Sequence, residues 1–199
     1  MTGRREQEIL TPDILLDAYR IGFFPMAESR DGPLSWYSPD PRGIIPLRPG
    51  NIPRSVRKLV RDGRFEVRFD TSFEQVMRAC AEREETWISE EIIAVYTALF
   101  KVGYGHSVEA WEGGALVGGL YGVAIGGAFF GESMFSRVSG TSKVALASLL
   151  TRLEASGFSL LDSQYITPHL AQFGAIEVPR IEYLALLENA LEIDVSFND

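Results

Sequence analysis

The chain has 199 residues, of which 46% are hydrophobic and 23% charged, so it can build one substantial core with a small appendage and is not a disordered chain. Its net charge of −8 argues against a polyanionic partner for the molecule taken as a whole. One cysteine and two histidines exclude an internal disulfide and leave little from which to build a zinc site, so we expect no metal and no cofactor.

The N-terminal part predicts a small lobe. Residues 1–8 carry no apolar run behind their arginines and so do not predict a signal peptide, and no stretch approaches the ~20 apolar residues of a membrane span; we expect a cytoplasmic monomer. A helix should begin at Thr11-Pro12-Asp13 and end at Gly22. Seven prolines between residues 24 and 53 favour irregular or edge-strand structure. We therefore assign residues 1–52 to a small proline-rich N-terminal lobe and residues 53–199 to a second domain.

A basic segment follows this lobe. Residues 54–68 hold six basic and two acidic side chains, a local charge of +4 in an acidic chain. Pro53 opens a short predicted helix to residue 62, and four cations recur on one face of it: Arg54, Arg57, Lys58 and Arg61. This face is a candidate for phosphate contacts, and a solvated face without a ligand is the alternative.

The remaining elements predict an α+β fold. We expect a strand at 65–69, helices at 72–83 and 89–102, and an antiparallel meander of strands at 107–111, 115–124 and 128–135. A long helix at 140–156, a strand at 158–162, a short helix at 168–173, a strand at 176–178 and a helix at 181–191 should follow. This order resembles the GNAT-type acyltransferase fold.

Glu132 is an anomaly, because it follows an apolar run, residues 128–131, that should lie inside the sheet. A lone buried carboxylate costs several kcal/mol, so Glu132 needs a cation or hydrogen-bond donors. One interpretation is a buried ion pair with a core arginine. The other, which we favour, is an anionic pocket for a cationic ligand.

Asp162 and Gln164 form a second polar group at the end of an apolar strand. If the strand continues, its alternation places both side chains on one face, where a carboxylate and an amide can work as one hydrogen-bonded unit. The alternative is a polar cap of the strand end.

Two tryptophans lie at loop edges: Trp36 in the proline-rich lobe and Trp87 just before the helix predicted at 89–102. Aromatic side chains in such places can stack on nucleobases, with roughly 1–3 kcal/mol per base, although core packing is the alternative for each. Residues 137–143 enter the long helix with an Arg-x-x-Gly-x-Ser pattern close to the CoA pyrophosphate loop of N-acetyltransferases. A CoA-dependent N-acetyltransferase is therefore an alternative function.

Together these stretches resemble the bacterial leucyl/phenylalanyl-tRNA–protein transferases. The resemblance runs from about residue 15 to residue 187, and its most specific blocks are Trp36-Tyr37-Ser38-Pro39-Asp40-Pro41-Arg42 and Gly131-Glu132-Ser133-Met134-Phe135-Ser136-Arg137. It implies a GNAT-like catalytic domain over residues 53–199. It also implies an enzyme that moves Leu or Phe from charged tRNA to a protein beginning with Arg or Lys, which marks that protein for degradation by the N-end rule.

The resemblance also implies roles for single residues. Trp36 and Trp87, with Tyr96 nearby, should bind the 3′-terminal adenosine; Glu132 should bind the acceptor; and Asp162 and Gln164 should form the catalytic pair. Six side chains should line the pocket for the Leu or Phe side chain: Leu120, Phe129, Met134, Leu149, Leu153 and Leu161. Several of these are Leu where better-known members have Met or Phe, so the preference between Leu and Phe stays open. A non-catalytic tRNA-binding or N-end adaptor module is a further alternative.

Overall fold

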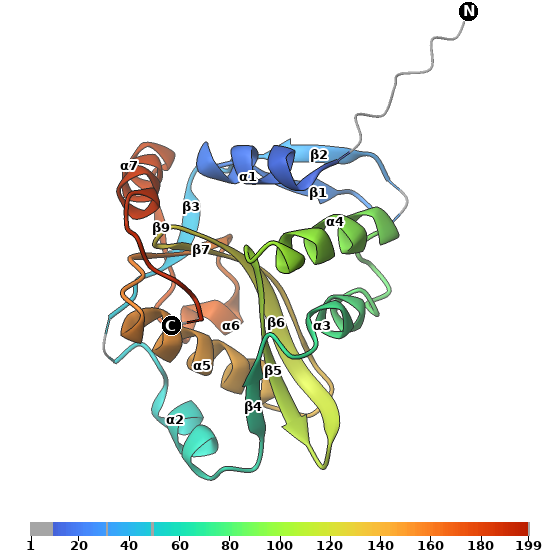
Figure 1. Cartoon of the computed structure of the whole chain (residues 1–199). Coiled ribbons are helices and arrows are strands. Elements are labelled where there is room, and N and C mark those ends of the chain that lie inside the picture. The colour runs from blue at the N-terminus through green and yellow to red at the C-terminus, as the bar shows by residue number, and fades with distance from the viewer. Residues whose placement is uncertain (1–9, 31, 49, 199) are drawn as a thin grey trace, which may run out of the picture.

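The structure is a computed structural model that describes residues 10–30, 32–48 and 50–198 (Figure 1). The expectation about a signal peptide concerns residues outside these ranges. Among the described residues, no helix is both long and apolar enough to cross a membrane.

The N-terminal lobe contains one helix and a two-stranded sheet. Helix α1 (Pro12–Arg20) begins as expected, because the Thr11 side chain accepts a hydrogen bond from the backbone of Ile14. Strands β1 (Phe24–Ala27) and β2 (Leu34–Tyr37) pair antiparallel beside it. Leu15, Leu16 and Tyr19 on the inner face of α1 are buried, and they join the core of the rest of the molecule.

A seven-stranded mixed sheet forms the centre of the molecule, in the order β4-β5-β6-β7-β8-β3-β9. Its strands are β3 (Arg42–Ile45), β4 (Glu66–Phe69), β5 (Gly105–Glu112), β6 (Ala115–Ile125), β7 (Ala128–Ser136), β8 (Leu160–Gln164) and β9 (Ile176–Val178). All neighbouring strands are antiparallel except β7 and β8, which are parallel. The α+β prediction is confirmed, and the meander followed by a helical crossover to a parallel strand is the order expected of a GNAT-like domain.

Helices cover both faces of this sheet (Figure 1). They are α2 (Arg54–Arg61), α3 (Phe73–Cys80), α4 (Glu90–Lys101), α5 (Thr141–Ala155), α6 (Pro168–Ala171) and α7 (Arg180–Leu191). Helices α3 and α4 share one apolar cluster with α1 and α7, whereas α5 builds a second cluster on the other face of the sheet. The sheet therefore separates two cores.

The element boundaries agree with the predictions to within three residues, and two of the differences have a clear physical reason. Helix α3 ends at Cys80 rather than at residue 83, where acidic side chains such as Glu82 and Glu84 would meet the negative end of the helix dipole. Strand β8 starts at Leu160 rather than at Phe158, because the Phe158 backbone N–H still bonds to the Leu153 carbonyl at the end of α5. The strand then continues to Gln164.

Two features of the sheet create the site. Strands β7 and β8 pair only over three positions, from Ala128 with Leu160 to Phe130 with Asp162. Beyond them β7 stays beside β6, while β8 stays beside β3, so the two parallel strands part and leave a gap. Strand β3 comes from the segment assigned to the N-terminal lobe, yet it lies between β8 and β9.

Candidate active site

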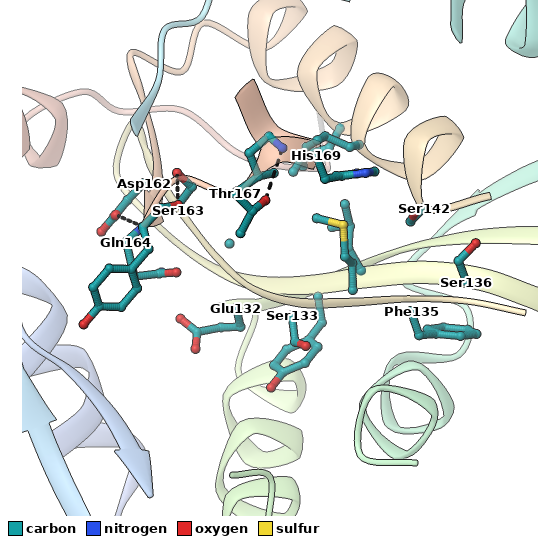
Figure 2. Close-up of a pocket in the computed structure, with 18 of the residues that line it drawn as sticks. Glu132, Ser133, Phe135, Ser136, Ser142, Asp162, Ser163, Gln164, Thr167 and His169 are labelled. Atoms are coloured by element: carbon teal, nitrogen blue, oxygen red, sulfur yellow. Dashed lines mark hydrogen bonds between the residues drawn. The ribbon is translucent and has the colours of Figure 1, made fainter. Parts of the chain in front are cut away.

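A cavity of about 670 Å³ opens where β7 and β8 separate (Figure 2). One end holds the polar side chains of Glu132, Asp162 and Gln164, and the other end holds Ser136, Ser142 and His169. The two carboxylates and the two serine hydroxyls thus lie at opposite ends of the same cavity.

The wall between these ends is apolar. Leu120, Met134, Leu149 and Leu161, four of the six side chains expected in an aminoacyl pocket, line the cavity. The other two, Phe129 and Leu153, are fully buried behind that lining. Leu146 also lines the cavity and was missed, although it lies one turn before Leu149 on the same apolar stripe of α5 and its spacing could have revealed it.

Glu132 is held by two tyrosines rather than by a cation. The Tyr19 hydroxyl donates to Oε1 at 2.6 Å, and the Tyr96 hydroxyl donates to Oε2 at 3.3 Å. The pKa of the Glu132 carboxyl is raised to about 7, mainly by burial and also by the negative charge of Asp162, and the two tyrosine hydrogen bonds oppose this rise. The interpretation as an ion pair with a core arginine is wrong for Glu132. The carboxylate instead faces a cavity in which a cationic ligand would favour its ionised form.

The core arginine belongs to Asp162. Arg42 donates from Nε to Oδ1 at 3.0 Å and from Nη2 to Oδ2 at 2.6 Å, and both side chains are fully buried. The expected unit of Asp162 and Gln164 exists, but through the backbone: the Gln164 N–H donates to Asp162 Oδ1 at 2.8 Å. Gln164 has a φ of 58°, which ends the regular alternation of β8 at this residue. Its side-chain Nε2 is buried and has no hydrogen-bond partner among the described residues.

The aromatic residues separate into different places. Trp87 lines the cavity, and so does Met26 of β1. Trp36 is 39% exposed and lines a separate shallow groove beside α1, so Trp36 and Trp87 do not flank one space. Tyr96 is fully buried, and its hydroxyl serves Glu132.

The basic face lies on α2, away from the cavity lining. All four of its cationic side chains are exposed, and within the described part of the chain none of them forms an ion pair: Arg54, Arg57, Lys58 and Arg61. Helix α2 packs against α5. The face is therefore available to an anionic surface that approaches the exposed side of α2.

The end of β7, the loop that follows it and the start of α5 border the far end of the cavity through Ser136, Arg137 and Ser142, respectively. Arg137 is engaged by the protein itself, because it donates to Glu82 at 2.6 Å and to the Leu116 carbonyl at 3.2 Å. An anion at this end would have to compete with the Glu82 carboxylate for Arg137.

Three buried groups at the acidic end were not identified from the sequence as site residues: Tyr19, Arg42 and Tyr183. Arg42 closes one of the two most specific sequence blocks, and Tyr19 lies on the apolar face of α1, so each carried a weak signal. Nothing in the spacing of Tyr183 indicates that its hydroxyl reaches Asp162 at 2.8 Å.

Comparison with known proteins shows the family to which the chain belongs. Residues 44–188 match the family model for leucyl/phenylalanyl-tRNA protein transferase, and residues 8–40 match the model for the N-terminal domain of the same family. The chain is 53% identical over 188 residues to a leucyl/phenylalanyl-tRNA–protein transferase of Gloeobacter violaceus, covering 94% of this chain and 97% of the relative. It is 56% identical over 187 residues to one of Paramagnetospirillum magneticum, covering 92% and 90% of the two chains.

Among solved structures, a GCN5-related N-acetyltransferase-like protein from Streptococcus suis matches with a TM-score of 0.38 and 17% identity, over 83% of this chain and 63% of the other. The sequence matches are far stronger than this likeness and extend over almost the whole length of the relatives. The chain belongs to the leucyl/phenylalanyl-tRNA protein transferase family.

Proposed function

We propose that this protein transfers Leu or Phe from a charged tRNA to the N-terminal Arg or Lys of an acceptor protein and so marks the acceptor for degradation by the N-end rule. One observation carries the proposal: an apolar wall and an acidic end meet in a single cavity where β7 and β8 part. The Leu or Phe side chain of an aminoacyl ester can bind the apolar wall, and a cationic N-terminus can bind the acidic end. The names of the relatives support the same donor and a protein as the acceptor.

The donor's side chain binds the apolar wall. Leu120, Met134, Leu146 and Leu149 form a lining without a charged group, which suits Leu or Phe and disfavours polar amino acids. Phe129 and Leu153 support this lining from behind, because both are fully buried in the core beneath it.

The rest of the donor binds at the rim of the cavity and beyond it. We assign the 3′-terminal adenosine to Trp87, with Met26 as the N-terminal-lobe side chain that shares the cavity. The exposed cations of α2 bind tRNA phosphates, which reconciles an acidic protein with a polyanionic substrate. Trp36 in its separate groove and Tyr96 in the core are then outside the adenosine site.

The acceptor enters at the acidic end. The carboxylate of Glu132 attracts a cationic N-terminal residue, and Gln164 lies at the same end of the cavity. Binding of a cation also favours the ionised form of Glu132, whose pKa lies at about 7 in its absence.

The reaction forms one bond and breaks one. The acceptor's α-amine nitrogen attacks the ester carbonyl carbon, the bond from that carbon to the ribose oxygen breaks, and the amine's proton passes to the departing ribose oxygen. A protein α-amine has a pKa of ~7.7–8.0, so roughly a tenth is already neutral at pH 7 and deprotonation limits the rate only about tenfold. Alignment of two bound reactants can contribute ~7–11 kcal/mol. The protein therefore acts mainly by holding two chain ends together, with the Gln164 side chain accepting a hydrogen bond from the amine and directing its lone pair.

The test is a transfer assay with purified protein. Radiolabelled Leu-tRNA or Phe-tRNA should label a peptide that begins with Arg or Lys and leave matched peptides that begin with Ala or Asp unlabelled. Labelling that ignores the first residue would contradict the acceptor specificity. A reaction supported by acetyl-CoA would favour the N-acetyltransferase alternative, and tight binding of tRNA and peptide without turnover would favour an adaptor.

A further inference from the structure

Among the described residues, Arg42 heads the large side chains that are fully buried, and each nitrogen of its guanidinium donates a hydrogen bond. Its Nε and Nη2 bind both carboxylate oxygens of Asp162, and its Nη1 donates to the Gly22 carbonyl at 3.1 Å. The guanidinium carbon lies 4.8 Å from the centre of the Phe24 ring and 4.5 Å from that of Tyr183. A planar, forked cation held on two edges and between two rings has one orientation, and so has the carboxylate it binds.

Asp162 has no capacity left for a substrate. Its Oδ1 accepts from Arg42 and from the backbone of Gln164, and its Oδ2 accepts from Arg42 and from the Tyr183 hydroxyl. These four hydrogen bonds occupy the lone pairs of an ionised carboxylate, and the side chain is fully buried. Asp162 therefore influences the reaction only through the groups it holds.

One of those groups is the backbone of Gln164. A φ of 58° lies in the left-handed region that side chains other than glycine rarely adopt, and the bond from Gln164 N–H to Asp162 fixes it there. The next residue is packed just as closely, because a β-carbon on Gly43 would lie 2.7 Å from the backbone of Tyr165. The direction of the Gln164 amide in the cavity thus depends on Asp162, which depends on Arg42.

We propose that Arg42 is a positioning residue of the transfer reaction: it fixes Asp162 and, through Asp162, the backbone that directs the Gln164 amide at the acceptor amine. The inference rests on the proposed function for the role of Gln164. It gives Asp162 an indirect role, and it makes a side chain of β3, far away in the sequence, part of the reaction centre.

Arg42 also has an electrostatic effect on Glu132. Burial is the main cause of the raised pKa of Glu132, the charge of Asp162 raises it further, and the charge of Arg42 lowers it. The titratable groups that face Glu132 come from four other elements: Tyr19, Tyr96, Tyr121 and Asp162. Loss of the Arg42 cation should therefore move the acid limb of the pH–rate profile to higher pH.

The first experiment measures single-turnover transfer and tRNA binding in Arg42→Lys and Arg42→Met, with Arg20→Met as a control. Arg20 is an exposed cation on α1 that pairs, among the described residues, only with Asp17. We expect Arg42→Lys to lower the transfer rate about 10- to 100-fold at saturating charged tRNA, because a point charge cannot replace the fork. The Kd for charged tRNA should change less than threefold. Arg42→Met should shift the acid limb of the pH–rate profile to higher pH, and Arg20→Met should leave the rate and the profile unchanged. Full rate in Arg42→Lys would overturn the proposal.

A double variant separates positioning from simple charge compensation. Arg42→Met alone leaves a buried carboxylate without its cation and should lower the Tm, whereas Arg42→Met with Asp162→Asn removes both charges. We expect the double variant to recover the Tm but to remain at least tenfold slow in single-turnover transfer. Recovery of the rate together with the Tm would mean that the pair only balances charge.

Hydrogen exchange gives a readout that does not need the reaction. The backbone N–H proton of Gln164 should exchange at least tenfold faster in Arg42→Met than in the wild type and in Arg20→Met. If the wild type transfers nothing, the proposed function fails, and the exchange of this proton still decides whether Arg42 fixes Gln164. Unchanged exchange in Arg42→Met would overturn the positioning role.

Discussion

Glu132 is a carboxylate of the site whose pKa is raised into the neutral range. Its pKa lies at about 7, against an ordinary value of 4.5, and it faces a cavity that a cationic chain end can enter. Asp162, only a strand away, is by contrast sealed by an arginine and a tyrosine. We therefore propose different tasks for the two acids of this site: Glu132 binds the acceptor, and Asp162 holds neighbouring groups in place.

The first prediction concerns Glu132→Gln. The loss of a charge-assisted contact should lower kcat/KM for an Arg-initiated peptide about 10- to 100-fold and leave the Kd for charged tRNA unchanged. The amide can still accept from Tyr19 and can donate to the Tyr96 oxygen, so the fold should persist. In both proteins kcat/KM for the peptide should fall at acid pH as the acceptor amine becomes protonated. In the wild type this fall should be steeper below about pH 7, where Glu132 also becomes neutral, and the variant should lack this additional fall.

The pH dependence of stability tests the raised pKa of Glu132 independently of activity. Between pH 4.5 and about 7 the folded protein holds a proton on Glu132 that the unfolded chain has lost, so the free energy of unfolding decreases as pH rises through this window and then levels off. Between pH 5 and pH 8 the Tm of Glu132→Gln should therefore rise relative to that of the wild type. The difference should be roughly 2–4 °C for each kcal/mol of unfolding free energy that the wild type loses. Equal Tm changes in both proteins would contradict the raised pKa.

The second prediction separates the amide of Gln164 from its backbone strain. Gln164→Ala and Gln164→Gly should both lower single-turnover transfer at least tenfold, because both remove the amide. Gly adopts a φ of 58° freely, so the Gly variant should be more stable than the Ala variant by about 1 kcal/mol. Both should stay slow at pH 9, since more neutral amine does not replace alignment. Recovery of Gln164→Ala at pH 9 would assign proton transfer to this residue.

The sequence indicates the polar members of the site but not how they are held. Glu132, Asp162 and Gln164 are recognisable because each interrupts or ends an apolar run. The partner of Asp162 is not recognisable, because Arg42 lies 120 residues earlier and reaches it only when β3 pairs with β8. Periodicity describes neighbours along one element and carries no information about such a pair.

At the scale of the element, α2 shows how an acidic protein can present a cationic surface. The helix buries Val56 and directs its four cations outward, and it packs on α5. Its existence followed from spacing alone, because one face is apolar and the other basic. Its position relative to the cavity did not, since packing between elements decides it.

The third prediction tests this surface. Reversing Arg57 and Lys58 to Glu should raise the KM for charged tRNA severalfold and reduce the slope of log K against log salt by about two, because two fewer counterions are released. Arg20→Glu with Lys101→Glu makes the same change in net charge on α1 and α4, and it should have a much smaller effect. Equal effects of the two pairs would mean that only the total charge matters.

At the scale of the whole molecule, β3 ties the two parts of the chain together. The order of helices and strands was predictable from local patterns, including the meander and the crossover. The insertion of β3 between β8 and β9 was not, because four residues with few local signals became a central strand through partners from the other end of the chain.

The fourth prediction concerns the boundary assigned between residues 52 and 53. A fragment of residues 53–199 should lack a cooperative thermal transition, because β8 and β9 lose the strand between them and Asp162 stays buried without Arg42. A fragment of residues 41–199 keeps β3, so it should melt cooperatively, although below the full chain. A stable fragment 53–199 would support the boundary at 52 as a true domain limit.

The same insertion sets an order of events during synthesis. At ~5–20 residues per second, the 120 residues from Arg42 to Asp162 take roughly 6–24 s to translate. For that interval the arginine has no carboxylate to bind, and the four residues of β3 have no strand beside them on either edge. Closure of so long a loop is slow compared with the local meander, which can form as soon as it leaves the ribosome. The contacts of Arg42 and Tyr183 with Asp162 cannot form before residue 183 has been made, so we expect the reaction centre to be completed late in synthesis.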